Sequence, residues 1–377
     1  MSVSSTGAAL LETGSRLTVD LTAVRANYSL LAARAAPAEC AAVVKANAYG
    51  LGVERVGPAL WEAGARTFFV AHPSEARILR DALPEAVVYA LNGLTSGAAP
   101  HLDTIGARPV LGSMPEIEEW SAFVRKQGQA GEAAIHIDTG MNRLGLSLEE
   151  AASVAKRFSA GELGFRPALV MSHLVIGDEP DHALTQRQLS NFRSAAALFP
   201  GVPASLANSA ATLTAADFRF DLCRPGIALY GGNPALDRPN PLQPVVTLEA
   251  RIMQIRSVPA GESVGYGAAE TVLRPSTLAI VSAGYADGFL RAAGSSTARK
   301  GAEAMIAGQR CPLVGRVSMD LIAVDVTALP DGAVSPGDFA TLIGQGITID
   351  ELAEHAGTIG YEILTRIGPR SVRIYKD

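Results

Sequence analysis

A lysine and a tyrosine four residues apart, Lys45 and Tyr49, follow a short apolar run that is typical of a buried strand, residues 41–44. A lysine at the end of such a strand either extends to water or is desolvated by its apolar neighbours. A desolvated amine can be neutral and form a Schiff base with an aldehyde cofactor. Tyr49 favours this second interpretation, because the segment after the strand turns back and its hydroxyl can reach an anion beside the lysine.

Polar residues also follow other predicted strands. Ser209 and the backbone N–H groups of Gly226 and Ile227 are suited to bind a phosphate, although Asn208-Ser209 by itself is more often a helix cap. Arg224 stands on a predicted strand, where it either forms an ion pair or donates to the nitrogen of a pyridine ring. Arginine is always charged and only donates, so it would keep that nitrogen unprotonated and make the ring a weaker electron sink.

The elements that must position these residues alternate from residue 17 to about residue 240. The predicted strands are 41–44, 67–71, 86–91, 108–111, 133–137, 168–172, 203–207 and 222–230, and helical patterns cover 53–63, 73–82, 115–127, 148–159 and 184–198. This α/β pattern predicts an N-terminal (β/α)8 TIM-like barrel, whose working face is the rim at the carboxyl ends of its strands. An open doubly wound sheet is the alternative, but no Gly-x-Gly-x-x-Gly follows the first strand.

Proline-rich sequence at 233–244 marks a boundary, which predicts domains at 14–240 and 241–377. Beyond it, short apolar runs separated by Gly, Pro and Asp predict a C-terminal, mainly antiparallel β domain. Only residues 349–356 and 360–364 have a helical pattern.

Composition excludes several classes of protein. The 377 residues carry a net charge of −5 with scattered Lys and Arg, so nucleic-acid binding is not expected. The cysteines form no Cys-x-x-Cys pair, so no metal site is expected. Three distant cysteines indicate buried thiols in a reducing compartment. No positive segment precedes the apolar patch at 8–11, and no apolar run reaches the ~18 residues of a membrane span. We therefore expect a cytoplasmic protein.

Across residues 17–372 the chain resembles the alanine racemases, fold-type III enzymes that depend on pyridoxal 5'-phosphate. The resemblance rests on Lys-x-Asn-x-Tyr at 45–49, on the barrel residues above, and on the segments 265–267, 284–288 and 315–320. It implies that the cofactor is bound by Lys45, Tyr49, His173, Asn208, Ser209, Arg224, Gly226, Ile227 and Tyr361. It also implies that Arg143, Met319 and Tyr285 contact the substrate, and that His136 and Asp320 support the site.

The reaction implied by the resemblance is the interconversion of L- and D-alanine, which supplies D-alanine for peptidoglycan precursors. Lys45 would handle the α-proton of the D-isomer and Tyr266 that of the L-isomer, from opposite faces. A relay from Tyr266 through His173 to Arg224 would stabilise the phenolate. Tyr266, Tyr285 and Met319 would come from the partner subunit of a head-to-tail homodimer.

Two positions depart from the family pattern. His136 replaces a lysine that is carbamylated in many members and pairs with the substrate arginine, here Arg143. Either an anion such as chloride, a water or another acidic side chain orients Arg143, or Arg143 is held less firmly. Leu51 stands where the family usually has histidine.

Three rivals remain. A broad-specificity or serine racemase of the same fold tends to be exported and to carry a cysteine pair, neither of which this sequence shows. A decarboxylase of this fold type favours a carboxylate in the place of Arg224. A non-catalytic pyridoxal-phosphate-binding protein would consist of the barrel alone.

Overall fold

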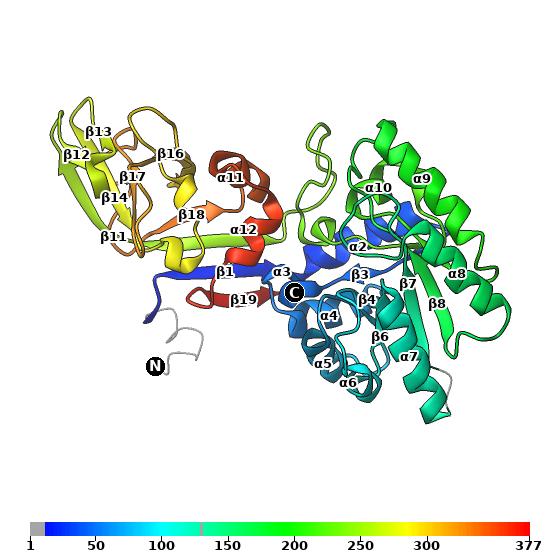
Figure 1. Ribbon diagram of the computed structural model, residues 1–377. Coiled ribbons are helices and arrows are strands. Elements are labelled where there is room, and N and C mark those ends of the chain that lie inside the picture. The colour runs from blue at the N-terminus through cyan, green and yellow to red at the C-terminus, as the bar shows by residue number, and fades with distance from the viewer. Residues whose placement is uncertain (1–11, 129–130) are drawn as a thin grey trace.

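The computed structural model describes residues 12–128 and 131–377. The first half of the chain forms a curled parallel sheet (Figure 1). The apolar patch at 8–11 lies outside the described residues. The sheet has the order β3 to β9, with each strand parallel to the next. Its strands are β3 (Ala42–Val43), β4 (Thr67–Val70), β5 (Val87–Ala90), β6 (Arg108–Leu111), β7 (Glu132–His136), β8 (Arg166–Met171) and β9 (Ala204–Ser205).

An eighth strand, β10 (Leu222–Cys223), pairs in parallel with β2 (Glu39–Cys40), which leads directly into β3. Backbone bonds from Arg224 N to Ala207 O and from Val43 N to Pro225 O join both neighbours of β10, so the sheet closes. The predicted barrel is confirmed. The predicted strand 222–230 is wrong in its second half, where Ile227–Tyr230 forms the 3-10 helix η2. Pro225 has no N–H to donate, which ends the ladder.

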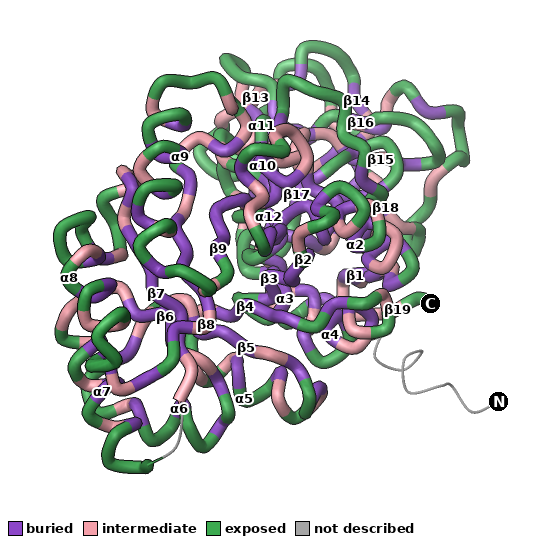
Figure 2. Tube along the Cα trace, turned by 90° about the vertical axis from the view of Figure 1, so that its right-hand side faces the viewer, coloured by how far each residue is buried: buried purple, intermediate pink, exposed green. Residues whose placement is uncertain are grey.

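Helices surround the sheet. They are α2 (Leu21–Ala35), α4 (Val53–Glu62), α5 (Pro73–Ala82), α6 (Ala99–Ile105), α7 (Met114–Gln127), α8 (Leu148–Ser159), α9 (Ala183–Ala196) and α10 (Ser209–Thr214). Their inner faces and the strands are buried and their outer faces exposed (Figure 2). This is the burial pattern that an apolar stripe of helical period predicts. Among residues 12–128 and 131–377, no helix is long and apolar enough to cross a bilayer.

The second half of the chain, together with β1 (Ser15–Asp20), forms a mainly antiparallel sheet of order β14-β17-β16-β15-β18-β11-β1-β19. Its strands are β11 (Val246–Val258), β14 (Ser276–Val281), β15 (Glu303–Ile306), β16 (Gln309–Val314), β17 (Ile322–Asp325), β18 (Phe339–Ile343) and β19 (Val372–Lys376). The hairpin β12 (Ser263–Val264) and β13 (Glu270–Thr271) and the helices α11 (Ile349–Ala356) and α12 (Gly360–Arg366) complete it.

The first strand of the chain lies in this second sheet. We expected residues 14–240 to form one domain, but β1 (Ser15–Asp20) pairs antiparallel with β11 and parallel with β19. Leu17 and Val19 are fully buried there. The correction has a simple cause: a strand pattern shows that one face is buried but not which sheet it joins.

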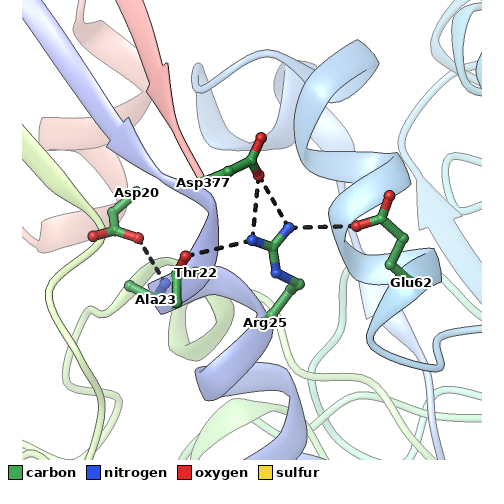
Figure 3. A network of polar contacts seen from close by, with 6 residues as sticks. All are labelled: Asp20, Thr22, Ala23, Arg25, Glu62 and Asp377. Atoms are coloured by element: carbon green, nitrogen blue, oxygen red, sulfur yellow. Dashed lines mark hydrogen bonds and ion pairs between the residues drawn. The ribbon is translucent and has the colours of Figure 1, made fainter.

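A polar network fastens the end of the chain to the barrel (Figure 3). The carboxylate of Asp20 caps α2 by accepting from the Ala23 amide at 2.8 Å. Arg25, one turn further, donates to Asp377 at 3.2 Å and to Glu62 of α4 at 3.4 Å. Strand β19 is therefore held beside α2 and α4, close to the segment that carries Lys45.

Candidate active site

A cavity of about 910 Å³ opens at the carboxyl ends of the barrel strands. Its lining brings together these predicted residues: Lys45, Tyr49, His136, Arg143, His173, Asn208, Ser209, Arg224, Gly226, Ile227 and Tyr361. All but Tyr361 lie at the ends of barrel strands or in the segments after them, whereas Tyr361 comes from α12 of the second half. The parallel strands converge at this rim, so residues far apart in sequence face a common space.

The lysine is followed by a full turn of left-handed backbone. Ala46, Asn47, Ala48 and Tyr49 have φ between 53° and 56°, and Gly50 continues with φ of 84°. Each non-glycine residue in this conformation costs ~1–2 kcal/mol, so the turn persists only because its surroundings hold it. The turn carries Lys45 at its beginning and Tyr49 at its end.

Hydrogen bonds hold this turn from two sides. On the barrel side, the Ala46 amide donates to Glu75 at 2.7 Å, and the Asn47 side chain accepts from the Val53 amide at 2.8 Å. On the other side, the Arg373 guanidinium donates to the Gly50 carbonyl at 2.9 Å, and the Tyr375 hydroxyl donates to the Leu51 carbonyl at 2.9 Å. Strand β19 therefore braces the lysine turn.

The amine of Lys45 faces the cavity in a positive environment. Burial of the amine by the surrounding protein lowers its pKa, and the charge of Arg143 lowers it further. Glu75 opposes this effect. A lowered pKa increases the fraction of neutral, nucleophilic amine near pH 7.

A second group of residues fits a phosphate. A Cβ at Gly226 would lie 2.3 Å from the Tyr49 hydroxyl oxygen, so only glycine admits this close approach. The Ser209 hydroxyl accepts from the Gly226 amide at 2.8 Å, and η2 begins at Ile227 with N–H groups that have no partner within the helix. Burial raises the pKa of Tyr49, so its hydroxyl stays a donor. These donors match an oxyanion.

Asn208 and Tyr361 lie at the edges of this group. The Asn208 side chain accepts from the Ala211 amide at 3.1 Å and so caps α10, as one of the two interpretations predicted. The Tyr361 ring lies 6.0 Å from the Tyr49 ring, and burial raises the pKa of its hydroxyl to about 12.

Arg224 is buried at the floor of the cavity. Its guanidinium donates to the Ser205 hydroxyl and to the Ser172 carbonyl. Burial lowers its pKa to about 10, which leaves it charged at neutral pH. Both named partners are neutral, and remaining N–H groups can donate to a ring nitrogen in the cavity.

The two histidines of the cavity are neutral near pH 7. Burial and the charge of Arg224 lower the pKa of His136 to about 4 and that of His173 to about 3. The charge of Arg224 thus acts on His173, and the relay from Tyr266 through these two residues stays a prediction. His136 supplies no negative charge for Arg143.

Arg143 lies on a loop whose backbone amides are held by the Asp138 carboxylate. Asp138 accepts from the amides of Gly140, Met141 and Asn142 at 2.8–2.9 Å, so its carboxylate braces the loop rather than the guanidinium. A Cβ at Gly145 would lie 2.5 Å from the Asp138 nitrogen, which requires glycine at the loop's return. The loop presents Arg143 to the cavity.

The remaining predicted residues lie on the β domain, and the chain's own cavity does not include them. Tyr266, Tyr285 and Met319 are 72%, 44% and 52% exposed. Bonds from Tyr285 N to Ser318 O and from Ala286 N to Met319 O join two of their loops. Asp320 accepts from Arg370 at 2.8 Å. Tyr285 and Met319 thus lie on neighbouring loops, and none of the three exposed side chains lines the chain's own cavity.

Sequence reasoning missed Glu75 and the left-handed turn. A glutamate two residues after a proline predicts only a helix start, and of the four left-handed residues only Asn47 belongs to a type that favours this conformation. It also missed the contribution of Thr365 and Arg366 of α12 to the cavity wall.

Two family models match the chain. They are described as "Alanine racemase, N-terminal domain", over residues 19–234, and "Alanine racemase, C-terminal domain", over residues 245–375.

Individual relatives agree along nearly the whole length. An alanine racemase of Methylobacterium sp. (strain 4-46) is 55% identical over 364 residues, which are 97% of this chain and 98% of the relative. A catabolic alanine racemase of Agrobacterium fabrum is 47% identical, over 95% of this chain and 91% of that protein. The crystal structure of alanine racemase from Bartonella henselae, with covalently bound pyridoxal phosphate, has a TM-score of 0.90 at 41% identity, covering 96% of this chain and 99% of that one.

Proposed function

The chain belongs to the alanine racemase family of pyridoxal-phosphate-dependent isomerases, and we propose that Lys45 and Tyr266 are the two acid–base groups of its L-alanine to D-alanine interconversion. One observation carries the proposal: a single cavity contains a lysine of lowered pKa, a phosphate-shaped group of donors and a buried arginine. These are the groups that bind the aldehyde, phosphate and pyridine nitrogen of one molecule.

The cofactor, when bound, supplies an aldehyde that captures the amino nitrogen of the substrate and a conjugated ring that stabilises negative charge at its Cα. Lys45 holds it covalently, and Tyr49, Ser209 and the amides of Gly226 and Ile227 hold its phosphate. Arg224 donates to the pyridine nitrogen and, because it stays charged, keeps that nitrogen unprotonated.

Racemisation requires a proton to leave one face of Cα and another to arrive on the opposite face. Lys45 would take or return the proton of the D-isomer on one face. Tyr266 handles that of the L-isomer, and the positive charge of Arg224, acting through His173, stabilises its phenolate.

The residues proposed to contact the substrate favour alanine over its rivals. Arg143 and the Met319 amide hold the substrate carboxylate, and Tyr285 narrows the space for the side chain. Sterics of this kind discriminate by ~1–3 kcal/mol per methylene, so slow turnover of serine is expected. Arg224 disfavours a decarboxylase, and the β domain disfavours a protein that only binds the cofactor.

A head-to-tail homodimer completes the site in this proposal. Tyr266, Tyr285 and Met319 are exposed on the β domain and lie outside the chain's own cavity, so a second copy is the natural source of these groups. A two-fold arrangement would give two equivalent sites.

We also propose a cellular location and a cellular role for the protein. The three cysteines are buried, odd in number and far apart in sequence, which supports a reducing, cytoplasmic compartment. We assign the D-alanine product to peptidoglycan precursors. Relatives named catabolic and biosynthetic match at 47% and 43% identity, so the name of a relative does not separate supply from breakdown.

The test uses purified protein with pyridoxal phosphate and, separately, the L-isomers of alanine, serine, lysine and arginine in heavy water. Loss of optical purity with deuterium at Cα, for alanine far ahead of serine, is the expected result. Exchange with retained configuration would mean that one base works alone. Comparable turnover of lysine or arginine would establish a broad-specificity racemase instead.

The replacement His136→Lys is expected to lower KM for alanine, by up to about tenfold, because a carbamylated lysine would pair with Arg143 whereas neutral His136 does not. Steady-state kinetics with and without added bicarbonate measure this, since only the lysine variant can form the carbamate. His136→Gln is the neutral control and should keep the wild-type KM. A lysine variant that binds alanine more weakly contradicts the prediction.

A further inference from the structure

One carboxylate that lies among none of the predicted site residues contacts the backbone directly after Lys45. Glu75 stands in the first turn of α5, and its Oε1 accepts from the Ala46 amide at 2.7 Å. Its Oε2 accepts from the amides of Ala71 at 2.6 Å and His72 at 3.2 Å. The two oxygens therefore connect the turn after β3 to the turn after β4.

The bond to Ala46 acts on the peptide group that links Ala46 to Lys45. That group is planar, so fixing its N–H fixes the direction in which the lysine leaves the strand and the entry into the left-handed turn. The turn begins at Ala46 and ends at Tyr49, whose hydroxyl approaches Gly226. An unfavourable backbone conformation between two cofactor ligands needs an external partner to hold it.

We propose that Glu75 is a positioning residue that sets the separation of the Lys45 amine and the Tyr49 hydroxyl, and thereby the affinity of the apoprotein for pyridoxal phosphate. The proposal rests on the proposed function, in which these two groups bind opposite ends of the cofactor. Arg373 and Tyr375 hold the far end of the same turn at Gly50 and Leu51, so Glu75 is the partner of the end nearest the lysine.

The barrel contains a matched control. Glu116, in the first turn of α7, accepts from the amide of Leu94 at 3.1 Å and from those of Gly112 at 2.6 Å and Ser113 at 3.1 Å. Like Glu75, it connects its own helix start to the loop of the preceding unit. The hydrogen bond that joins Glu116 to the preceding unit comes from the amide of Leu94, and Leu94 does not line the cavity.

The experiment compares wild type, Glu75→Gln and Glu116→Gln as apoproteins titrated with pyridoxal phosphate. The visible absorbance of bound cofactor gives Kd, and borohydride reduction with mass spectrometry locates the attachment. A glutamine offers one acceptor oxygen and turns an N–H group toward the other donors, so both variants lose comparable bonds and should melt at similarly lowered temperatures. Kd should rise about tenfold or more in Glu75→Gln and change less than about threefold in Glu116→Gln.

A second readout separates positioning from a general loss of stability. The amine of Lys45 faces Arg143, neutral His173 and Glu75, and only Glu75 raises its pKa. The pKa of Lys45 in the apoprotein can be measured from the pH dependence of its reaction with an amine-acylating reagent. This pKa should therefore fall in Glu75→Gln and stay at the wild-type value in Glu116→Gln.

Equal cofactor affinity in the two glutamine variants, at similar melting temperatures, overturns the positioning role. Wild-type protein that forms no adduct at Lys45 contradicts the proposed function itself. The two failures are therefore distinguishable in one set of titrations.

Discussion

Replacement of Lys45 by alanine is expected to lower kcat for alanine racemisation at least about a thousandfold and to leave the protein without covalently attached cofactor. The change removes both the amine that captures the aldehyde and the group that moves the proton on one face. Loss of an acid–base group alone typically costs 10²–10⁴ in rate, and the loss of covalent attachment adds to it. Racemase activity and the mass of the borohydride-reduced protein measure the two effects.

Lys156→Ala is the matched control, because Lys156 is exposed in the last turn of α8 on the outside of the barrel. It should retain wild-type activity and the full cofactor adduct. Melting temperatures should stay close to wild type in both variants, since neither lysine side chain contributes to the core. A Lys45→Ala protein that keeps more than a few per cent of wild-type kcat, which means a barrier raised by less than about 2 kcal/mol, would refute the assignment.

The barrel and most of its rim were predictable because their determinants are local. Helices α5 and α8 begin and end at the predicted residues, since an apolar stripe and a capping residue are both visible in sequence. The residues that follow the strands then meet at one rim by topology alone. The sequence therefore predicts that Lys45, His173 and Arg224 share one rim, and all three line the same cavity.

The errors occurred where the determinants are distant. The pattern of β1 shows one buried face but not that its neighbours are β11 and β19, more than two hundred residues later. The left-handed turn at 46–49 exists because Glu75, Arg373 and Tyr375 hold it, and no local preference of Ala-Asn-Ala-Tyr predicts it. Tertiary contacts of this kind override local preference.

Residues of the barrel and residues of the β domain contribute to the same site. Strand β19 belongs to the second sheet by its pairing, yet its Arg373 and Tyr375 brace the turn that carries Lys45. Helix α12 contributes Tyr361 to the same cavity. The β domain is thus part of the chain's own site. It is also the proposed source of Tyr266 for the site of the partner subunit, a contribution that an isolated barrel could not make.

Mixing two inactive variants, Lys45→Ala and Tyr266→Phe, is expected to restore about a quarter of wild-type activity. If the partner's β domain completes each site, a hybrid dimer has one site with both defects and one with neither. Random exchange makes about half of the dimers hybrid, and half of the sites in each are intact. Activity is measured after subunit exchange of differently tagged proteins, and hybrids purified through both tags should reach about half of wild type.

The control pairs Lys45→Ala with Arg143→Ala, two changes on the same barrel rim. A hybrid of these variants contains no intact site in either position, so activity should stay at the level of the separate variants. Recovery in this control would mean that subunits exchange barrel residues rather than β domains. If hybrids of the Tyr266 pair form but recover no activity, both acid–base groups must lie within one chain. The β domain would then have to move toward its own cavity, against the hydrogen bonds from Arg373 and Tyr375 that hold β19 beside Lys45.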